Sequence, residues 1–261
     1  MNSQWPVTLM KKDSLELPSL LQSVFRNEIA ALVIKNFWSL ERCRKAVEVI
    51  MGYGFDYYEG VYPPIGRIGI TQFEHRFSNR EKSSYFDKAP GANKTRSDLF
   101  IESGDPVKEV TNLLHCFTDT HVAVESTGEE YFAGLVRNIH EALLHLDFAP
   151  RDALGWDISN ILAQVSWNIV LQEAEKGGQT VVYKRPWMKS DEMRKVPESY
   201  GYEMELVRDR QEATIEGEAG DFVVFNSQNF HRVLPTEGQR LRLTVSSFIG
   251  LTGSGTLLLW S

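Results

Sequence analysis

The sequence predicts an α+β protein in which helices dominate the first half of the chain and short strands the second. Up to about residue 127, apolar residues recur at helical spacing between capping residues and Gly or Pro. From about residue 128, short runs of alternating or β-branched residues follow one another, separated by glycine-containing turns. This order favours an antiparallel sandwich or barrel behind a helical part over alternating β-α units.

Three helices and one early strand are predicted in the first half. Pro18 suits the first turn of a helix that runs to about residue 29, and residues 30–34 form a buried strand. Ser39 can cap a helix over residues 39–51, and Asp105 can cap another over residues 106–115. Residues 53–70 are rich in aromatic residues, Gly and Pro, and we expect a long ordered loop there.

Eight strands are predicted in the second half. They cover residues 143–148, 161–171, 180–183, 212–215, 222–225, 230–234, 241–248 and 256–260. The polar stretch 184–202 is too long for a hairpin turn, so we expect a lid-like insertion.

Composition excludes several classes of protein. The chain has 261 residues, 42% of them hydrophobic and 24% charged, which suits one soluble domain over residues 1–261. A net charge of −7 argues against nucleic-acid binding. Residues 1–18 lack the apolar stretch of a signal peptide, and no run of 18 apolar residues predicts a membrane span. Cys43 and Cys116 are expected to be reduced and mostly buried, as in a cytoplasmic protein.

A tripeptide, His145-Leu146-Asp147, carries the strongest chemical signal. On a strand, residues two apart point to the same side, so His145 and Asp147 can reach one metal ion together. His231, on a later predicted strand, can add a second imidazole. Two imidazoles and one carboxylate form the facial triad of non-haem Fe(II) oxygenases. The sequence therefore predicts an iron enzyme.

A basic strand follows the second histidine. In the run from Arg240 to Val245, charged or polar side chains alternate with apolar ones, so Arg242 and Thr244 share a face. Together they can clamp the carboxylate of an organic co-substrate. Arg240 lies on the same face and is the competing candidate.

Other chemistries fit less well. His140 and His145 are five apart, whereas the helical zinc-protease motif needs histidines four apart. No Gly-x-Ser-x-Gly elbow supports a hydrolase. Two alternatives stay open: a metal-free jelly-roll binding module, and a cupin-type metal isomerase or thiol dioxygenase.

Taken in order, these motifs resemble the Fe(II)/2-oxoglutarate-dependent oxygenase superfamily. Within it, the chain is most similar to the carrier-protein-independent branch of aliphatic halogenases and N-substituted amino-acid hydroxylases. The likeness covers about residues 135–261 and is weaker over 66–100. The motifs that carry it are Leu144-His145-Leu146-Asp147-Phe148, Gly177-Gly178-x-x-Val181-Val182-Tyr183, Gly220-Asp221-Phe222-Val223-Val224-Phe225-Asn226, His231-Arg232-Val233, Arg242-x-Thr244 and Leu259-Trp260-Ser261.

The resemblance implies a double-stranded β-helix (jelly-roll) core, flanked by N-terminal helices, and Fe(II), 2-oxoglutarate and O₂ as cofactor and co-substrates. By that resemblance His145, Asp147 and His231 hold the iron, and Arg242 with Thr244 holds the 2-oxoglutarate C5-carboxylate. Arg137 also approaches the co-substrate. The expected partner is a free small molecule, with no carrier protein, nucleic acid or membrane, and the enzyme is a candidate homodimer.

The reaction type depends on residue 147. Halogenases of this branch have glycine where this chain has Asp147, and the glycine leaves a coordination position open for chloride. The aspartate therefore predicts hydroxylation of an unactivated C–H bond in an amino-acid derivative or a related natural-product scaffold. Desaturation, ring closure and halogenation are the alternative outcomes of the same chemistry.

The substrate is expected to lie between the loops of the helical half and the 184–202 insertion. Arg67, Arg76 and Arg151 are candidates to pair with a substrate carboxylate. The other candidate wall residues are Tyr62, Ile70, Phe73, His75, Trp167 and Trp187.

Overall fold

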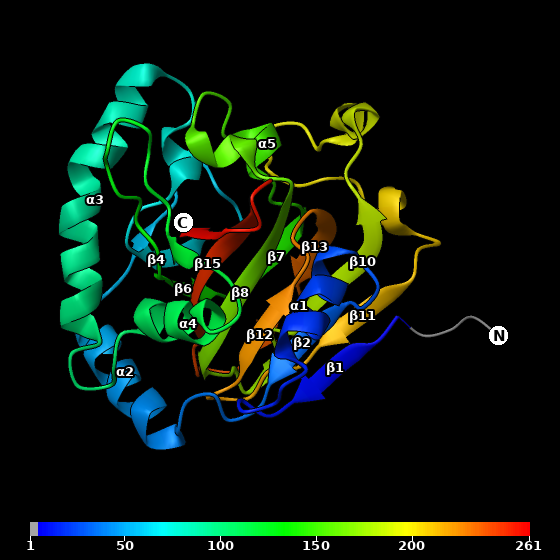
Figure 1. The fold of residues 1–261 in the computed structure, drawn as a ribbon. Helices are drawn as coiled ribbons and strands as arrows, with labels where there is room; N and C mark the ends of the chain where they lie inside the picture. The colour runs from blue at the N-terminus through cyan, green and yellow to red at the C-terminus, as the bar shows by residue number, and fades with distance from the viewer. Residues whose placement is uncertain (1–4) are drawn as a thin grey trace.

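The computed structural model of the chain describes residues 5–261, so the first part of the segment 1–18 lies outside the described residues. Two β-sheets pack face to face, and helices cover the outer face of the larger sheet (Figure 1). Among residues 5–261, no helix is both long enough and apolar enough to cross a membrane.

Ten strands of the described chain form the larger sheet, in the order β1-β2-β12-β8-β15-β6-β4-β3, and β16 with β5 extends it beside β15. Strand β15 is long enough to pair along its whole length with β8 and, on its other edge, with β6 and then β16. The strands are β1 (Val7–Met10), β2 (Ala31–Ile34), β3 (Asp56–Tyr57), β4 (Ile65–Ile68), β5 (Thr120–Val122), β6 (Leu135–Ile139), β8 (Ala163–Gln172), β12 (Phe222–Phe225), β15 (Leu243–Leu251) and β16 (Leu257–Trp260).

The smaller sheet has four strands within residues 5–261, in the order β11-β10-β13-β7, and all of its pairs are antiparallel. A separate two-stranded ribbon joins β14 to β9. These strands are β7 (Ala142–His145), β9 (Lys176–Gly177), β10 (Thr180–Pro186), β11 (Glu212–Ile215), β13 (Asn229–Val233) and β14 (Thr236–Glu237).

The helices begin where the sequence supplies caps. Ser39 accepts a hydrogen bond from the main chain of Arg42, and Asp105 accepts hydrogen bonds from the main chain of Val107 and Lys108. The α-helices are α1 (Leu17–Phe25), α2 (Leu40–Tyr53), α3 (Asn79–Leu99), α4 (Pro106–His115) and α5 (Ala149–Asp152), with short 3₁₀ turns η1 (Gln72–His75), η2 (Asp157–Asn160), η3 (Lys189–Arg194) and η4 (Met204–Val207).

Strand β8 shows how the two faces of the large sheet divide. Val165, Trp167 and Ile169 point outward into the core formed with the apolar faces of α1, α2 and α4. Val170 points inward with β12 side chains and meets Val182 of the small sheet. The inward positions nearer the start of the strand, at 164, 166 and 168, are all polar. Period-two alternation thus places an apolar core on one face and a polar wall on the other.

The structure confirms the predicted strand 212–215, the strand 222–225 and the helix over 106–115, and it corrects several boundaries. The first helix ends at Phe25, because Asn27 takes a positive φ of 63°. The predicted loop 53–70 was wrong in part, since it contains β3 and β4, which add the outermost strands to the large sheet. Both cysteines are free, but Cys116 is exposed, contrary to expectation.

Candidate metal centre and its cavity

The two candidate histidine ligands lie opposite each other on neighbouring strands. His145 ends β7, and its Cα partner on β13 is His231, so the ring centroids are 4.2 Å apart. Asp147 lies two residues beyond β7, with its Oδ2 3.4 Å from His231 Nε2 and 3.9 Å from His145 Nε2. The candidate ligand atoms all lie within 4.8 Å of one another, and within residues 5–261 no other group of His, Cys, Asp and Glu meets this condition.

Main-chain carbonyls orient both imidazoles. His145 Nδ1 donates to the carbonyl of Leu143 at 2.7 Å, and His231 Nδ1 donates to that of Asn229 at 2.9 Å. Each ring therefore carries a proton on Nδ1 and turns Nε2 towards the carboxylate of Asp147. Hydrogen bonding of the second ring nitrogen in this way is typical of metal-binding histidines.

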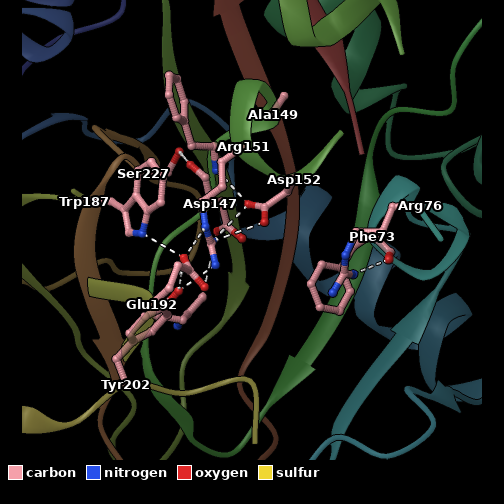
Figure 2. Close-up of polar contacts among 12 residues, drawn as sticks. Phe73, Arg76, Asp147, Ala149, Arg151, Asp152, Trp187, Glu192, Tyr202 and Ser227 are labelled. Carbon is pink, nitrogen blue, oxygen red and sulfur yellow. Dashed lines mark hydrogen bonds and ion pairs between the residues drawn. The ribbon is translucent and has the colours of Figure 1, made fainter. Parts of the chain in front are cut away.

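The backbone of Asp147 is fixed without help from its carboxylate. Its N–H donates to the carbonyl of Ser227 at 2.9 Å. Its carbonyl accepts from Gln164 Nε2 and from Ser227 Oγ, each at 3.2 Å. Gln164 also accepts from the N–H of Ala149, so one side chain holds both ends of this short turn. Figure 2 shows Ser227 beside Asp147 in this arrangement. The carboxylate takes no part in this support and faces Nε2 of both histidines.

The surroundings favour the protonation states that a metal requires. Burial and the neighbouring His231 lower the pKa of His145 to about 4. Burial alone raises the pKa of Asp147, but the hydrogen bond with His231 and the nearby His145 outweigh it, so the pKa falls well below its usual range. At neutral pH the centre therefore holds a neutral imidazole at His145 and a carboxylate at Asp147, as metal binding needs.

Two arginines beside the centre have no acidic partner within residues 5–261. Arg137, on β6, and Arg242, one residue before β15, make no ion pair. Arg242 Nε donates to the carbonyl of Gly178 at 2.7 Å, and its Nη2 lies 3.5 Å from Thr180 Oγ1. Burial and Arg137 lower the pKa of Arg242 to about 10. Two guanidinium groups whose charges repel each other favour an anion between them.

Two buried polar atoms on the strands that carry or follow these arginines lack a hydrogen-bond partner among residues 5–261. They are Arg137 Nε and Thr244 Oγ1, and the two residues are register partners across β6 and β15. A cavity of about 250 Å³ lies beside Arg242 and Thr180. Buried polar atoms are almost always paired, so these donors fit a dicarboxylate such as 2-oxoglutarate.

The structure separates the predicted arginine candidates. Arg242 reaches inward, and its hydroxyl neighbour is Thr180, which the sequence analysis missed, while Thr244 stands unpartnered nearby. Arg240 is exposed and donates to the carbonyl of Ala174. Gly178 explains the close approach of Arg242, because a Cβ there would lie 2.9 Å from Arg242 Cδ, and its φ is +76°. The Gly-Gly-x-Thr pattern of residues 177–180 was the sequence signal that could have pointed to Thr180.

A cavity of about 620 Å³ opens over the metal centre and includes His145, Asp147 and Arg137 in its wall. Its other walls come from the β3–β4 loop, η1, α5 and the 184–202 insertion. Of the predicted wall residues, Phe73, Arg76, Arg151 and Trp187 line it. The volume is in the usual range for a small-molecule site.

Five predicted wall residues lie elsewhere. Trp167 is fully buried on the outward face of β8 against Phe222, the face opposite the cavity. Arg67 pairs with Glu74 at 2.7 Å, and Ile70 packs against the cluster around Tyr85 and Trp156. The last two, Tyr62 and His75, are respectively 80% exposed and buried against the carbonyl of Thr71.

Comparison with known proteins gives the family. The family model described as carrier-protein-independent halogenase WelO5 matches residues 4–261. The chain belongs to this family. With the His-Asp-His donor set, membership makes it an Fe(II)/2-oxoglutarate-dependent oxygenase that uses Fe(II), 2-oxoglutarate and O₂, as the sequence predicted.

Individual proteins similar to this chain include two curated sequences and one solved structure. Leucinostatins biosynthesis cluster protein S of Purpureocillium lilacinum is 41% identical over 206 residues, 75% of this chain and 83% of that protein. The L-gamma-glutamyl-L-propargylglycine hydroxylase of Streptantibioticus cattleyicolor is 32% identical over 136 residues, 51% of this chain and 50% of that enzyme. An N-substituted L-amino acid dioxygenase from Burkholderia ambifaria shares the fold, with a TM-score of 0.66 at 16% identity over 94% of this chain and 91% of that chain.

Proposed function

We propose that this WelO5-family member hydroxylates an unactivated C–H bond of a free small molecule, an amino-acid derivative or a related natural-product scaffold. The observation that carries the proposal is the meeting of His145, Asp147 and His231, with both histidine Nδ1 atoms already engaged and with His145 and Asp147 in the wall of the 620 Å³ cavity. The hydroxylase from Streptantibioticus cattleyicolor and the Burkholderia ambifaria dioxygenase, both named for amino-acid compounds, support the substrate class.

In this proposal the two packed sheets are the jelly-roll core of one domain over residues 1–261, and the insertion 184–202 is its lid. His145, Asp147 and His231 hold Fe(II), which with O₂ and 2-oxoglutarate supplies the oxidising power. The protein contributes an oriented ligand set and a cavity with an apolar wall on Phe73 and Phe248 that limits water around the reacting carbon.

Arg242 is the proposed anchor of the 2-oxoglutarate C5-carboxylate, because its buried charge has no acidic partner in residues 5–261. Thr180 and Thr244 supply hydroxyl groups to the same anion, and Arg137, between Arg242 and the metal centre, balances the remaining charge of the co-substrate. Arg240, exposed and bonded to the carbonyl of Ala174, has no part in this site.

Hydroxylation is favoured over halogenation because Asp147 is present. Its carboxylate lies 3.4 Å from His231 Nε2 and can fill the coordination position that a glycine would leave open. The family name alone would suggest a halogenase, and Asp147 is the reason for the different assignment.

The first prediction tests this assignment. Anaerobic Fe(II) plus 2-oxoglutarate should give a weak visible charge-transfer band with the wild-type protein, and both ligands together should raise its melting temperature.

Asp147→Ala should lose hydroxylation, and Asp147→Gly should lose it while admitting chloride. Asp209→Ala, an exposed acidic control, should behave as wild type. Hydroxylation by Asp147→Gly at the wild-type rate would refute the ligand assignment, and absence of the band and of the stabilisation would refute the oxygenase proposal.

A further inference from the structure

The large cavity contains guanidinium groups in two different electrostatic states. Arg151 is neutralised from within the protein: its Nη1 lies 3.1 Å from Asp152 Oδ1 and its Nε donates to Glu192 at 2.9 Å. Glu192 also accepts from Trp187 Nε1 at 2.9 Å and from the Tyr202 hydroxyl at 3.0 Å (Figure 2). An incoming anion would have to displace Glu192 from three donors to reach Arg151.

Arg76 lines the same cavity without such compensation. Among residues 5–261 no carboxylate lies within ion-pair distance of its guanidinium. The group stacks on the rings of Phe73 and Phe77, with centroid distances of 3.5 and 4.4 Å, and donates one hydrogen bond to the carbonyl of Phe73. In Figure 2, Arg76 and Phe73 lie apart from the cluster around Arg151. Stacking on aromatic rings fixes the guanidinium plane and leaves its other donors free.

Comparing the negative charges of the bound co-substrate with the arginines around the site indicates a role for Arg76. In the proposed function, 2-oxoglutarate brings two carboxylates, and Arg242 with Arg137 balances them at the inner end of the site. This leaves Arg76, which is partly buried, without an ion-pair partner among residues 5–261. Burial lowers its pKa, although the more distant Asp152 and Glu81 oppose that shift. A partly buried cation that lines a cavity and lacks an ion-pair partner is expected to receive an anion from the ligand.

We propose that Arg76 binds a carboxylate of the primary substrate, so that the enzyme selects acids over the corresponding amides. This inference rests on the proposed function and deepens it. The ligand is a monocarboxylate, because Asp152 and Glu192 in the same wall disfavour a second negative charge nearby. The apolar body of the acid packs on the aromatic wall formed by Phe73, Trp187 and Phe248.

The test compares acids with their amides on the iron-loaded enzyme. N-acetyl-L-amino acids with Leu, Ile, Val, Phe or Trp side chains, and the primary amide of each, are assayed with Fe(II), 2-oxoglutarate and O₂ for succinate release and oxidised product. We expect turnover of acids, with the matching amides at least about tenfold poorer in kcat/KM, since a charge-assisted bidentate contact is lost. Equal turnover of acid and amide, or turnover of neither, would overturn the inference.

Variants locate the contact. Arg76→Gln should raise KM for the preferred acid by roughly 10- to 100-fold with a much smaller change in kcat, and should leave turnover of the amide as it is in wild type. Arg76→Lys should recover part of the loss, which separates a lost charge from misfolding. Arg80→Gln removes an exposed arginine at the start of α3 that does not line the cavity, and should leave KM unchanged. A rise in KM with Arg151→Gln instead of Arg76→Gln would assign the contact to Arg151 and overturn the inference.

Failure of the inference and failure of the proposed function give different results. Substrate-independent succinate formation from 2-oxoglutarate, lost in Asp147→Ala, reports the oxygenase even if Arg76 plays no part. If acids and amides are oxidised alike while that activity persists, only the carboxylate site is wrong. If Fe(II) and 2-oxoglutarate give neither succinate nor the visible band, the proposed function fails and the inference fails with it.

Discussion

The metal centre and the neighbouring basic group, which consists of Arg137 and Arg242 with Thr180 and Thr244, are organised in different ways. Both lie between the same two sheets. At the metal centre, main-chain carbonyls engage both histidine Nδ1 atoms, and the turn carrying Asp147 is held by Ser227 and Gln164. At the basic group, within residues 5–261, Arg137 Nε and Thr244 Oγ1 have no hydrogen-bond partner and no carboxylate pairs with Arg242.

This difference indicates which part of the site the protein builds alone and which part a ligand completes. The imidazoles are already oriented before a metal arrives, so little reorganisation is needed on binding. The basic group instead retains an electrostatic cost that an anion relieves, so its contribution to free energy belongs to the complex. Changes at the basic group should therefore affect 2-oxoglutarate binding more than they affect folding.

Arg242→Ala should give the largest effect on the basic group. Loss of a charge-assisted contact should raise the 2-oxoglutarate KM by roughly 10- to 100-fold, while the stability of the ligand-free protein changes little or increases. Steady-state kinetics with varied 2-oxoglutarate and chemical denaturation measure the two effects. Arg240→Ala is the matched control, since Arg240 is exposed and bonded to the carbonyl of Ala174. The reverse pattern, with the control raising KM and Arg242→Ala silent, would move the anchor to Arg240.

The metal centre should show its organisation through pH. In the metal-free protein the pKa of His145 is about 4, below its usual value near 6.5, so the unfolded chain binds the proton first as pH falls. Stability should be greatest above about pH 6.5 and fall between about 6.5 and 4, by up to roughly 1.4 kcal/mol per pH unit from this group. Urea titrations across that range measure the slope. His145→Gln should flatten it, and the exposed His121→Gln should flatten it less. Equal slopes in wild type and His145→Gln would contradict the assignment.

Thr244→Val should give the smallest effect and the most specific one. The Thr244 hydroxyl is fully buried and unpartnered, so an isosteric methyl group should leave the ligand-free protein as stable as wild type or more stable by under about 1 kcal/mol. The same change should weaken 2-oxoglutarate binding, measured by calorimetry with Fe(II) replaced by a redox-inert divalent metal. A loss of stability without a change in affinity would show that the hydroxyl serves the fold and not the ligand.

Much of the second half of the fold could be predicted because period two and glycine turns act locally. Strands β11 and β12 have the predicted bounds, since each is a short alternating or β-branched run between turn residues. Helix α3 was missed because its sequence is polar on most sides, includes Pro90 and Gly91, and buries few side chains, such as Tyr85 and Ala89.

The parts of the site that depend on the residue spacing within one strand could be predicted from the sequence. The His-x-Asp spacing follows from one strand, and the structure brings its two side chains to within 3.9 Å of each other. Thr180 was missed because it meets Arg242 only through the packing of two sheets, and the two residues are 62 positions apart in the chain. Trp167 was misplaced because a tryptophan suits either face of a strand, and only the helices packed against β8 decide which face is buried.

The turn around Asp147 has a consequence for how such an enzyme can diverge. Its main chain is held at both N–H and carbonyl by Ser227 and Gln164, and the carboxylate takes no part in that support. A change at this position should therefore alter the chemistry without first requiring a repair of the scaffold. One codon can separate two reaction outcomes here, and selection can test the second without the loss of stability that most substitutions cause.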